Sequence, residues 1–385
     1  MTTALTRRHL LAAALAVGAT VPFGAGRAHA AGAEAAPGKA LLMTPPPTGP
    51  HPIGTVDLHL LGAPNGRELM ASVWYPAAAG ACRFPVAPWM PAAGWRALLD
   101  GVGIGGDAAG APPTAGHEAA PVLHARDRLP VVLYSHGNDS CRAETTVVVQ
   151  ELASHGYVVV TVDHTGDGYS EFPDGRVAVP SEDSFTPWDS AHDMVFVLDR
   201  IEALAAGRNP DAGRRRLPAG LGAALDLRRV GMFGWSKGAT STAITMNIDP
   251  RVRAGLSLDG PMESVPRPVA IDRPFMLMTA DFGRDAEPAV EEFWQLLRGW
   301  RLDVRAEGAV HGSYTDSQWL IPPLAAITGM SPEDLAEWVG TLDPGRAVRI
   351  QQAYPLAFFD LHLRNRRQRL LRGPSAAFPE VRFIR

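Results

Sequence analysis

The amino-acid sequence predicts an α/β fold with a mostly parallel central sheet and helices on both faces. From residue 130 onward, short runs of apolar residues alternate with amphipathic segments of helical length. Several of the apolar runs end at an acidic residue or histidine, and ligands bind at the carboxyl ends of strands in such sheets. With 385 residues, 46% of them hydrophobic, the chain can form a large core, and we expect one domain over residues 51–385.

The first thirty residues predict an export signal. Arg7 and Arg8 precede an Ala/Leu/Val-rich run that ends in Ala28-His29-Ala30. A charged start, an apolar stretch and an A-x-A site are typical of a secretory signal, and paired arginines indicate the twin-arginine route. We therefore expect a secreted protein, with residues 31–50 as a mobile Pro/Gly/Ala-rich linker and no transmembrane segment in the mature chain. The net charge of −4 disfavours nucleic-acid binding, which needs a basic face.

The expected elements follow in order. Two strands (residues 55–61 and 68–75) flank the turn signal Asn65-Gly66, and a Pro/Gly-rich insertion at about 77–128 contains one short helix near 94–99. Further strands are expected at 130–134, 157–162, 230–233, 254–258, 275–279 and 302–306. Helices are expected at 144–155, 190–206, 239–247, 288–298, 332–340 and 345–363.

The most informative motif is Gly234-Trp235-Ser236-Lys237-Gly238, a G-x-S-x-G pentapeptide between an apolar strand and a helix. In that setting the motif is the nucleophile elbow of α/β-hydrolases. The strand-to-helix turn is tight, so the two glycines avoid clashes while the hydroxyl of Ser236 projects above the sheet. The sequence therefore predicts Ser236 as a catalytic nucleophile.

A serine nucleophile needs a base and a carboxylate, which in elbow hydrolases follow it in the order acid, then histidine. Only His311 and His362 lie beyond the elbow; His311 follows the last strand in a loop, whereas His362 lies within a helix, so we expect His311 to be the base. Asp259 and Asp281 each follow a strand, and periodicity does not separate them; Asp285 is a weaker third option.

Two backbone amides are expected to form an oxyanion hole. One is that of Lys237, directly after the nucleophile, and the other is that of Asn138, in the loop after the strand at 130–134. This chemistry needs no cofactor, and no metal is implied.

These segments resemble the platelet-activating-factor acetylhydrolase family, plasma and intracellular type II, within the α/β-hydrolases. The resemblance covers about residues 67–320 and rests on Pro88-Trp89-Met90-Pro91, Tyr134-Ser135-His136-Gly137-Asn138, the segment 152–159, Val162-Asp163-His164, the elbow with Ala239-Thr240, Leu258-Asp259 and Val310-His311. It implies Asp259 as the acid, since this family takes its acid from the strand after the elbow helix. It also implies a serine esterase that cleaves short or oxidised acyl esters, such as those at the sn-2 position of phospholipids.

The chain departs from the family pattern at Lys237, where an aromatic residue is usual, and in having a single glycine after it. We expect the Lys237 side chain to point into solvent, with attraction of an anionic substrate group as the alternative. A set of apolar side chains in the insertion is expected to pack against the sheet, or else to form a lid or a lipid-contacting edge: Trp89, Met90, Trp95, Leu98 and Leu99. Asp163, His164 and Asp167 are expected to support the site.

Two other functions remain open. A cutinase-like or polyester hydrolase, or a general lipase, would use Asp281 as its acid, and a catalytically silent hydrolase fold would serve as a binding module. Cys82 and Cys141 would lie outside the cytoplasm, where they could form a disulfide or remain two buried thiols.

Overall fold

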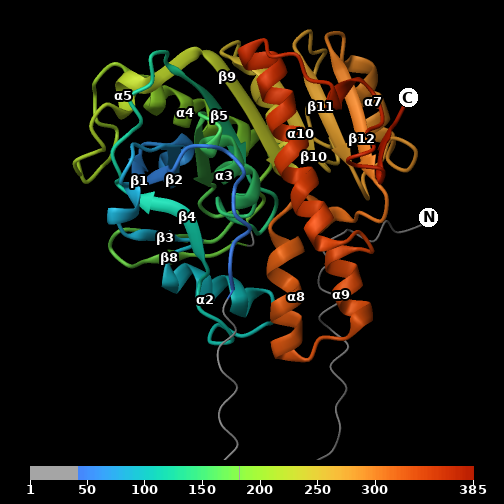
Figure 1. The fold of residues 1–385 in the computed structure, drawn as a ribbon, viewed down its shortest axis with the longest axis horizontal. Coiled ribbons are helices and arrows are strands. Elements are labelled where there is room, and N and C mark those ends of the chain that lie inside the picture. The colour runs from blue at the N-terminus through green and yellow to red at the C-terminus, as the bar shows by residue number, and fades with distance from the viewer. Residues whose placement is uncertain (1–41, 182) are drawn as a thin grey trace, which may run out of the picture.

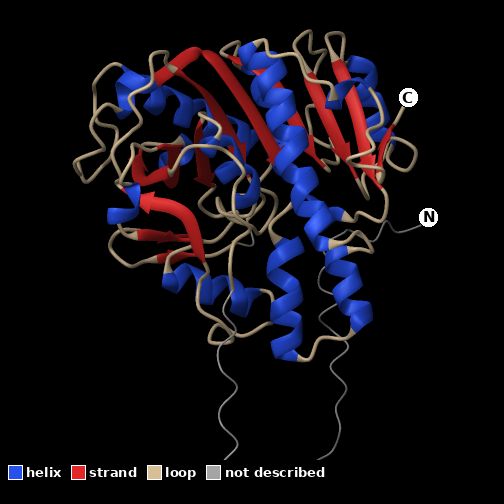
Figure 2. Ribbon diagram, viewed as in Figure 1, coloured by secondary structure: helices blue, strands red, loops and turns tan. Residues whose placement is uncertain are grey.

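The central feature of the computed structural model, which describes residues 42–181 and 183–385, is a twisted sheet flanked by helices (Figures 1 and 2). Its strands lie in the order β13-β12-β11-β10-β9-β5-β6-β2-β1-β4-β3. Six neighbouring strands from β12 to β6 are parallel, whereas β2 and β13 pair antiparallel with the two ends of that set. The predicted fold class is therefore confirmed. The predicted export signal, residues 1–30, lies outside the described residues.

The strands are β1 (Ile53–Leu61), β2 (Glu68–Pro76), β3 (Val86–Pro88), β4 (Pro113–Glu118), β5 (Leu129–Ser135), β6 (Val158–Asp163), β9 (Leu225–Trp235), β10 (Val252–Leu258), β11 (Phe275–Thr279), β12 (Arg301–Ala306) and β13 (Val381–Phe383), with β7 (Ser170–Glu171) and β8 (Val177–Ala178) forming a separate small hairpin. The helices are α2 (Ala92–Gly101), α3 (Thr146–Ser154), α4 (Pro187–Ala205), α5 (Leu221–Ala224), α6 (Lys237–Ile248), α7 (Pro288–Leu296), α8 (Ser317–Thr328), α9 (Pro332–Val339) and α10 (Pro344–Arg364).

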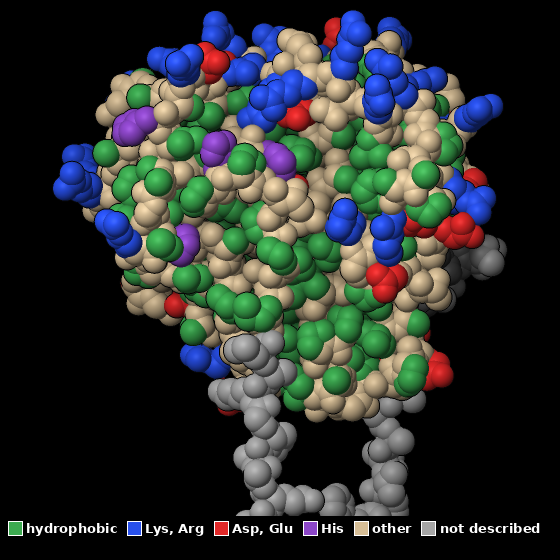
Figure 3. Space-filling model, viewed as in Figure 1, with side chains coloured by type: hydrophobic (Ala, Val, Ile, Leu, Met, Phe, Trp, Pro, Cys, Tyr) green, Lys and Arg blue, Asp and Glu red, His purple; other side chains and the backbone are tan. Residues whose placement is uncertain are grey.

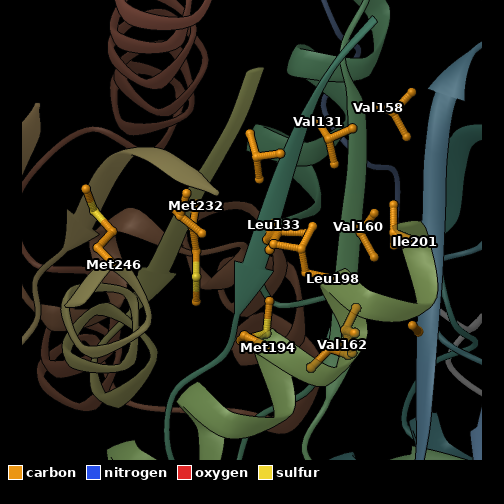
Figure 4. Packing of buried hydrophobic residues seen from close by; sticks show 14 of the residues in the cluster. Val131, Leu133, Val158, Val160, Val162, Met194, Leu198, Ile201, Met232 and Met246 are labelled. Carbon is orange, nitrogen blue, oxygen red and sulfur yellow. The ribbon is translucent and has the colours of Figure 1, made fainter. Parts of the chain in front are cut away.

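The central strands are buried on both faces because successive side chains point to opposite sides of the sheet. On one face, Leu133 of β5 and Val160 of β6 pack against Leu198 of α4 in a cluster that also includes α6 and α7 (Figure 4). On the other face, Val132 and Val159 pack in a second cluster with α3 and α10. Truncating one such buried leucine to alanine costs about 2–5 kcal/mol. This packing holds the carboxyl ends of the strands, where the candidate site lies, in a rigid frame.

The insertion is more ordered than its composition suggests. Besides the expected helix, found as α2, it contributes β3 and β4, which extend the sheet beyond β1. A further helix, α8, was not predicted, because Pro322 and Pro323 lie in its middle and proline normally interrupts a helix. In Figure 1, α2, α8 and α9 project together below the sheet.

The apolar residues of the insertion form a third cluster with α8 and α9. All five predicted side chains are buried there, from 2% exposed for Trp95 to 9% for Leu98, against Leu320, Ile321 and Leu324. The expected burial is therefore correct, but these side chains pack against α8 and α9 and not against the sheet, and they offer no exposed lipid-binding edge. Hydrophobic side chains do gather at the surface over α8 (Figure 3), where Ile327 is exposed. No helix within the described part of the chain combines the length and hydropathy that crossing a membrane requires.

One expectation near the N-terminal end is wrong. Residues 42–50 were expected to be part of a mobile linker, but Thr48 bonds to Glu151, and the amide of Gly49 donates to Ser154 of α3 at 3.1 Å. Of the two alternatives left open for the cysteines, the structure has free thiols at Cys82 and Cys141. Cys82 is exposed in a short turn of the insertion, whereas Cys141 is buried in the third cluster, so packing separates the two sulfur atoms.

Candidate active site

Ser236 occupies the tight turn between β9 and α6. Its backbone has φ 55° and ψ −123°, a conformation that costs a non-glycine residue about 1–3 kcal/mol. Such strain persists only where the surrounding structure enforces it, and it is typical of nucleophile turns. The side chain of Ser236 is half-buried, so a small substrate can reach its hydroxyl.

The flanking glycines are required by close backbone contacts. A Cβ at Gly234 would lie 2.1 Å from the carbonyl oxygen of Gly238, and a Cβ at Gly238 would lie 2.0 Å from that of Ser135. Both distances are far below contact, and both partners are backbone atoms. Because both positions are glycine, the start of α6 packs directly against β9 and β5, as the motif predicts.

His311 and Asp259 are joined at the same edge of the sheet. His311 follows β12 in a short 3-10 turn, and its Nδ1 lies 2.7 Å from Oδ2 of Asp259, which follows β10. Asp259 is fully buried, yet its carboxylate accepts backbone N–H groups of Ala280 at 2.7 Å and Phe282 at 3.0 Å. These bonds stabilise the ionised carboxylate without a cation. Asp259 can therefore hold the proton of the neutral ring on Nδ1, which leaves a lone pair on Nε2.

The competing candidates have other partners. Asp281 accepts the backbone N–H of His311 at 3.0 Å and makes no hydrogen bond to its ring; burial raises the pKa of its carboxyl. Asp285 pairs with Arg305. His362 packs in α10 against Trp300 with ring centroids 4.4 Å apart, and burial lowers its pKa to about 4. Thus Asp259 alone of these acids bonds the ring of His311.

Aromatic side chains hold the imidazole of His311 next to the elbow. Trp235, which precedes Ser236, packs on the ring at 4.6 Å between centroids, and its indole N–H donates to the His311 carbonyl at 3.0 Å. Phe282 contacts the ring edge-on at 4.9 Å. Across residues 42–181 and 183–385, no hydrogen bond joins the Ser236 hydroxyl to His311; such bonds are often long in free enzymes and tighten around a substrate.

Two backbone N–H groups lie beside Ser236 without partners. A Cβ at Gly137 would lie 2.9 Å from Cβ of Ser236, which puts the loop after β5 directly against the nucleophile. In the described part of the chain, neither the amide of Asn138 nor that of Lys237 donates a hydrogen bond. Unpaired N–H groups at a helix N-terminus and an adjoining loop are suited to bind a developing oxyanion.

The side chain of Lys237 was expected in solvent, and this is wrong. It is 6% exposed, forms an ion pair with Asp167, and its Nζ lies 4.8 Å from the ring centre of Phe185. Burial lowers the pKa of Lys237 and raises that of Asp167 to about 6, since a charge inside the protein loses its hydration. The ammonium group is neutralised within the protein and is unavailable to an anionic substrate.

The chain is similar to known proteins over different parts of its length. Residues 38–170 match the family described as "Platelet-activating factor acetylhydrolase, isoform II". A "Probable 1-alkyl-2-acetylglycerophosphocholine esterase" of Arthroderma benhamiae is 24% identical over 66% of this chain and 66% of its own length. The "Platelet-activating factor acetylhydrolase" of Cavia porcellus is 22% identical over 63% of this chain and 59% of its own. These matches support membership of the platelet-activating factor acetylhydrolase family.

The similarity to one solved structure extends beyond residues 38–170, the part that matches the family. The ferulic acid esterase from Streptomyces cinnamoneus superposes with a TM-score of 0.76 and 30% sequence identity, over 90% of this chain and 100% of that one. The aligned parts of the two curated relatives, by contrast, span slightly less than two thirds of their lengths.

Behind the site lies a second set of buried polar residues, whose pairing the sequence did not predict. Ser135 Oγ lies 2.9 Å from Nε2 of His164, whose Nδ1 lies 2.9 Å from Asp193. Asp193 is paired on both carboxylate oxygens by Arg67, at 2.8 and 2.5 Å. In the sequence, the one sign of this set is Asp193, an acidic residue within the apolar face of α4.

The other expected supporting residues also pair within the protein. Asp163 pairs with Arg142, and Asp167 pairs with Lys237.

Proposed function

We propose that this protein is a serine carboxylic ester hydrolase in which Ser236, His311 and Asp259 form the catalytic triad. The observation that carries the proposal is the short contact between His311 Nδ1 and the buried Asp259, next to a strained serine turn. In that arrangement the hydroxyl of Ser236 attacks the ester carbonyl while Nε2 of His311 takes its proton.

The remaining steps follow from the same groups. The N–H groups of Asn138 and Lys237 stabilise the oxyanion, and the imidazolium returns its proton to the leaving alcohol. Water then attacks the acyl-enzyme with His311 as base, which releases the acid and restores Ser236. Asp259 holds the ring in one tautomer and stabilises its charged form throughout.

For the substrate we propose esters of short acyl groups, including short or oxidised sn-2 acyl chains of phospholipids. The names of the two curated relatives support this class. The ferulic acid esterase suggests aromatic acyl esters as the second candidate, since its likeness covers nearly the whole chain. The polyester-hydrolase alternative depended on Asp281 as the acid, and Asp281 instead bonds the backbone N–H of His311.

The experiment uses the purified protein and a fluorophosphonate probe, followed by a panel of esters. We expect labelling of Ser236 and turnover of nitrophenyl acetate and butyrate, with comparison of a 2-acetyl phospholipid and methyl ferulate deciding between the substrate classes. Folded protein that neither takes the probe nor hydrolyses any ester would favour the binding-module alternative.

We also propose that residues 1–30 direct export by the twin-arginine route, on the strength of Arg7 and Arg8 before the apolar run. Replacing both arginines by lysine should retain the protein inside a bacterial host that otherwise exports it. Unchanged export of that variant would exclude the route.

A further inference from the structure

The peptide that joins Gly137 to Asn138 is held from its carbonyl side. Nδ1 of His136 lies 2.6 Å from the carbonyl oxygen of Gly137. In a trans peptide the carbonyl of one residue and the N–H of the next point in opposite directions. A bond that fixes the Gly137 carbonyl therefore also fixes the direction of the Asn138 N–H, which has no partner among residues 42–181 and 183–385.

The hydrogen-bond pattern sets which nitrogen of His136 carries the proton. The backbone N–H of His164 donates to Nε2 of His136 at 3.0 Å, so Nε2 must present its lone pair. The hydrogen of the neutral ring is then on Nδ1, where it can be donated to Gly137. The nearest carboxylate oxygen, that of Asp167, lies 4.0 Å from Nδ1 and favours the same tautomer.

The ring of His136 has no room to turn. It is fully buried, and its centroid lies 4.8 Å from that of His164. Gly168 contacts the opposite edge so closely that a Cβ there would lie 2.8 Å from Cε1 of His136. Burial also lowers the pKa of His136 well below its usual value, since the charged ring would lose its hydration. Both nitrogens are thus committed to backbone groups, and neither is free to exchange protons with a substrate.

We propose that His136 is a positioning residue which directs the Asn138 N–H at the reacting carbonyl, through the bond from Nδ1 to Gly137. The inference rests on the proposed ester hydrolysis and adds to it a residue that touches no substrate. It makes the oxyanion hole depend on a histidine tautomer that the backbone of His164 selects.

Two substitutions separate the two nitrogens. In His136→Asn the side-chain amide N–H takes the place of Nδ1–H, while the acceptor for His164 is lost. In His136→Gln the amide oxygen reaches toward the His164 N–H, while the donor to Gly137 is lost. Because a misdirected oxyanion donor acts in the transition state, we expect His136→Gln to lower kcat for nitrophenyl acetate by about 100-fold with little change in KM, and His136→Asn by less than about tenfold.

The control is His362→Gln, which removes a half-buried histidine far along the chain in α10; its kcat should equal that of the unsubstituted protein. Crystal structures of both His136 variants supply a readout independent of turnover, with the Gly137 carbonyl reoriented only in His136→Gln.

If folded His136→Gln kept full kcat, or if His136→Asn lost as much as His136→Gln, the positioning role would be refuted. An unsubstituted protein that hydrolyses no ester would refute the proposed function, and the carbonyl direction in the two crystal structures would still decide the role of His136.

Discussion

Two sets of serine, histidine and aspartate occur in this protein, and they differ in what surrounds the carboxylate. In one, His311 lies 2.7 Å from Asp259, and in the other, His164 lies 2.9 Å from Asp193. The contacts are alike, but Asp193 is neutralised by Arg67, whereas Asp259 is held by backbone N–H groups.

Exposure separates the two sets as well. The His311 side chain is 28% exposed and Ser236 is half-buried, whereas Ser135, His164 and Asp193 are fully buried. A carboxylate without a cation can stabilise a histidine that becomes charged during a reaction, and an accessible serine can meet a substrate. Residue types and pairwise distances therefore do not define a catalytic triad by themselves. The serine must also be accessible, and the carboxylate must not be neutralised by a cation.

The largest expected difference is between the two serines. Ser236→Ala should lower kcat for nitrophenyl acetate by at least about 10⁴-fold, because Ser236 is the proposed site of the acyl-enzyme. Ser135→Ala removes one neutral hydrogen bond, worth about 1 kcal/mol, and should cost less than about tenfold. Steady-state assays of both variants check this prediction. Equal losses in the two variants would contradict the assignment of Ser236 as the nucleophile.

The acids should differ nearly as much. Asp259→Asn should lower kcat by about 10⁴-fold, since the amide favours the wrong tautomer of His311. In Asp281→Asn the side-chain oxygen still accepts the His311 N–H, so the loss should stay within about tenfold. The same ester assay measures both; a larger loss in Asp281→Asn would restore Asp281 as the acid.

The buried set should matter for stability. Arg67→Leu leaves the Asp193 carboxylate without its cation and should lower the free energy of unfolding by about 3–5 kcal/mol. Adding Asp193→Asn should recover part of that loss, because no uncompensated charge then remains. Urea denaturation monitors both variants, and an unaltered midpoint for Arg67→Leu would show that the ion pair contributes nothing.

The smallest effect concerns His362, a half-buried histidine outside both sets. Burial lowers the pKa of His362 from 6.5 to about 4. Between these pH values the unfolded chain binds a proton that the folded chain does not, so stability is lost as the pH falls from 6.5 toward 4. In His362→Gln the urea midpoint should decline less over that range, and an identical decline would contradict the assignment.

Local sequence was sufficient for the elements that have their own periodicity or turn chemistry. The alternating strands and helices, the glycine-flanked Ser236 and the histidine that follows β12 are all encoded within short segments. Helix α8 was missed because its two prolines argue against a helix, and tertiary packing against α2 and α9 overrides them.

What the sequence by itself determined is the order of the main strands and helices, the turn that carries Ser236 and a short set of candidate partners. Only the tertiary structure decided that the ring of His311 bonds Asp259, as the family resemblance implied, and not Asp281, that Lys237 is buried against Asp167, and that the two cysteines are not joined. The reason is that hydrogen-bond partners and burial are set by strands that become neighbours in the sheet, and the spacing of residues along the chain carries no record of those contacts.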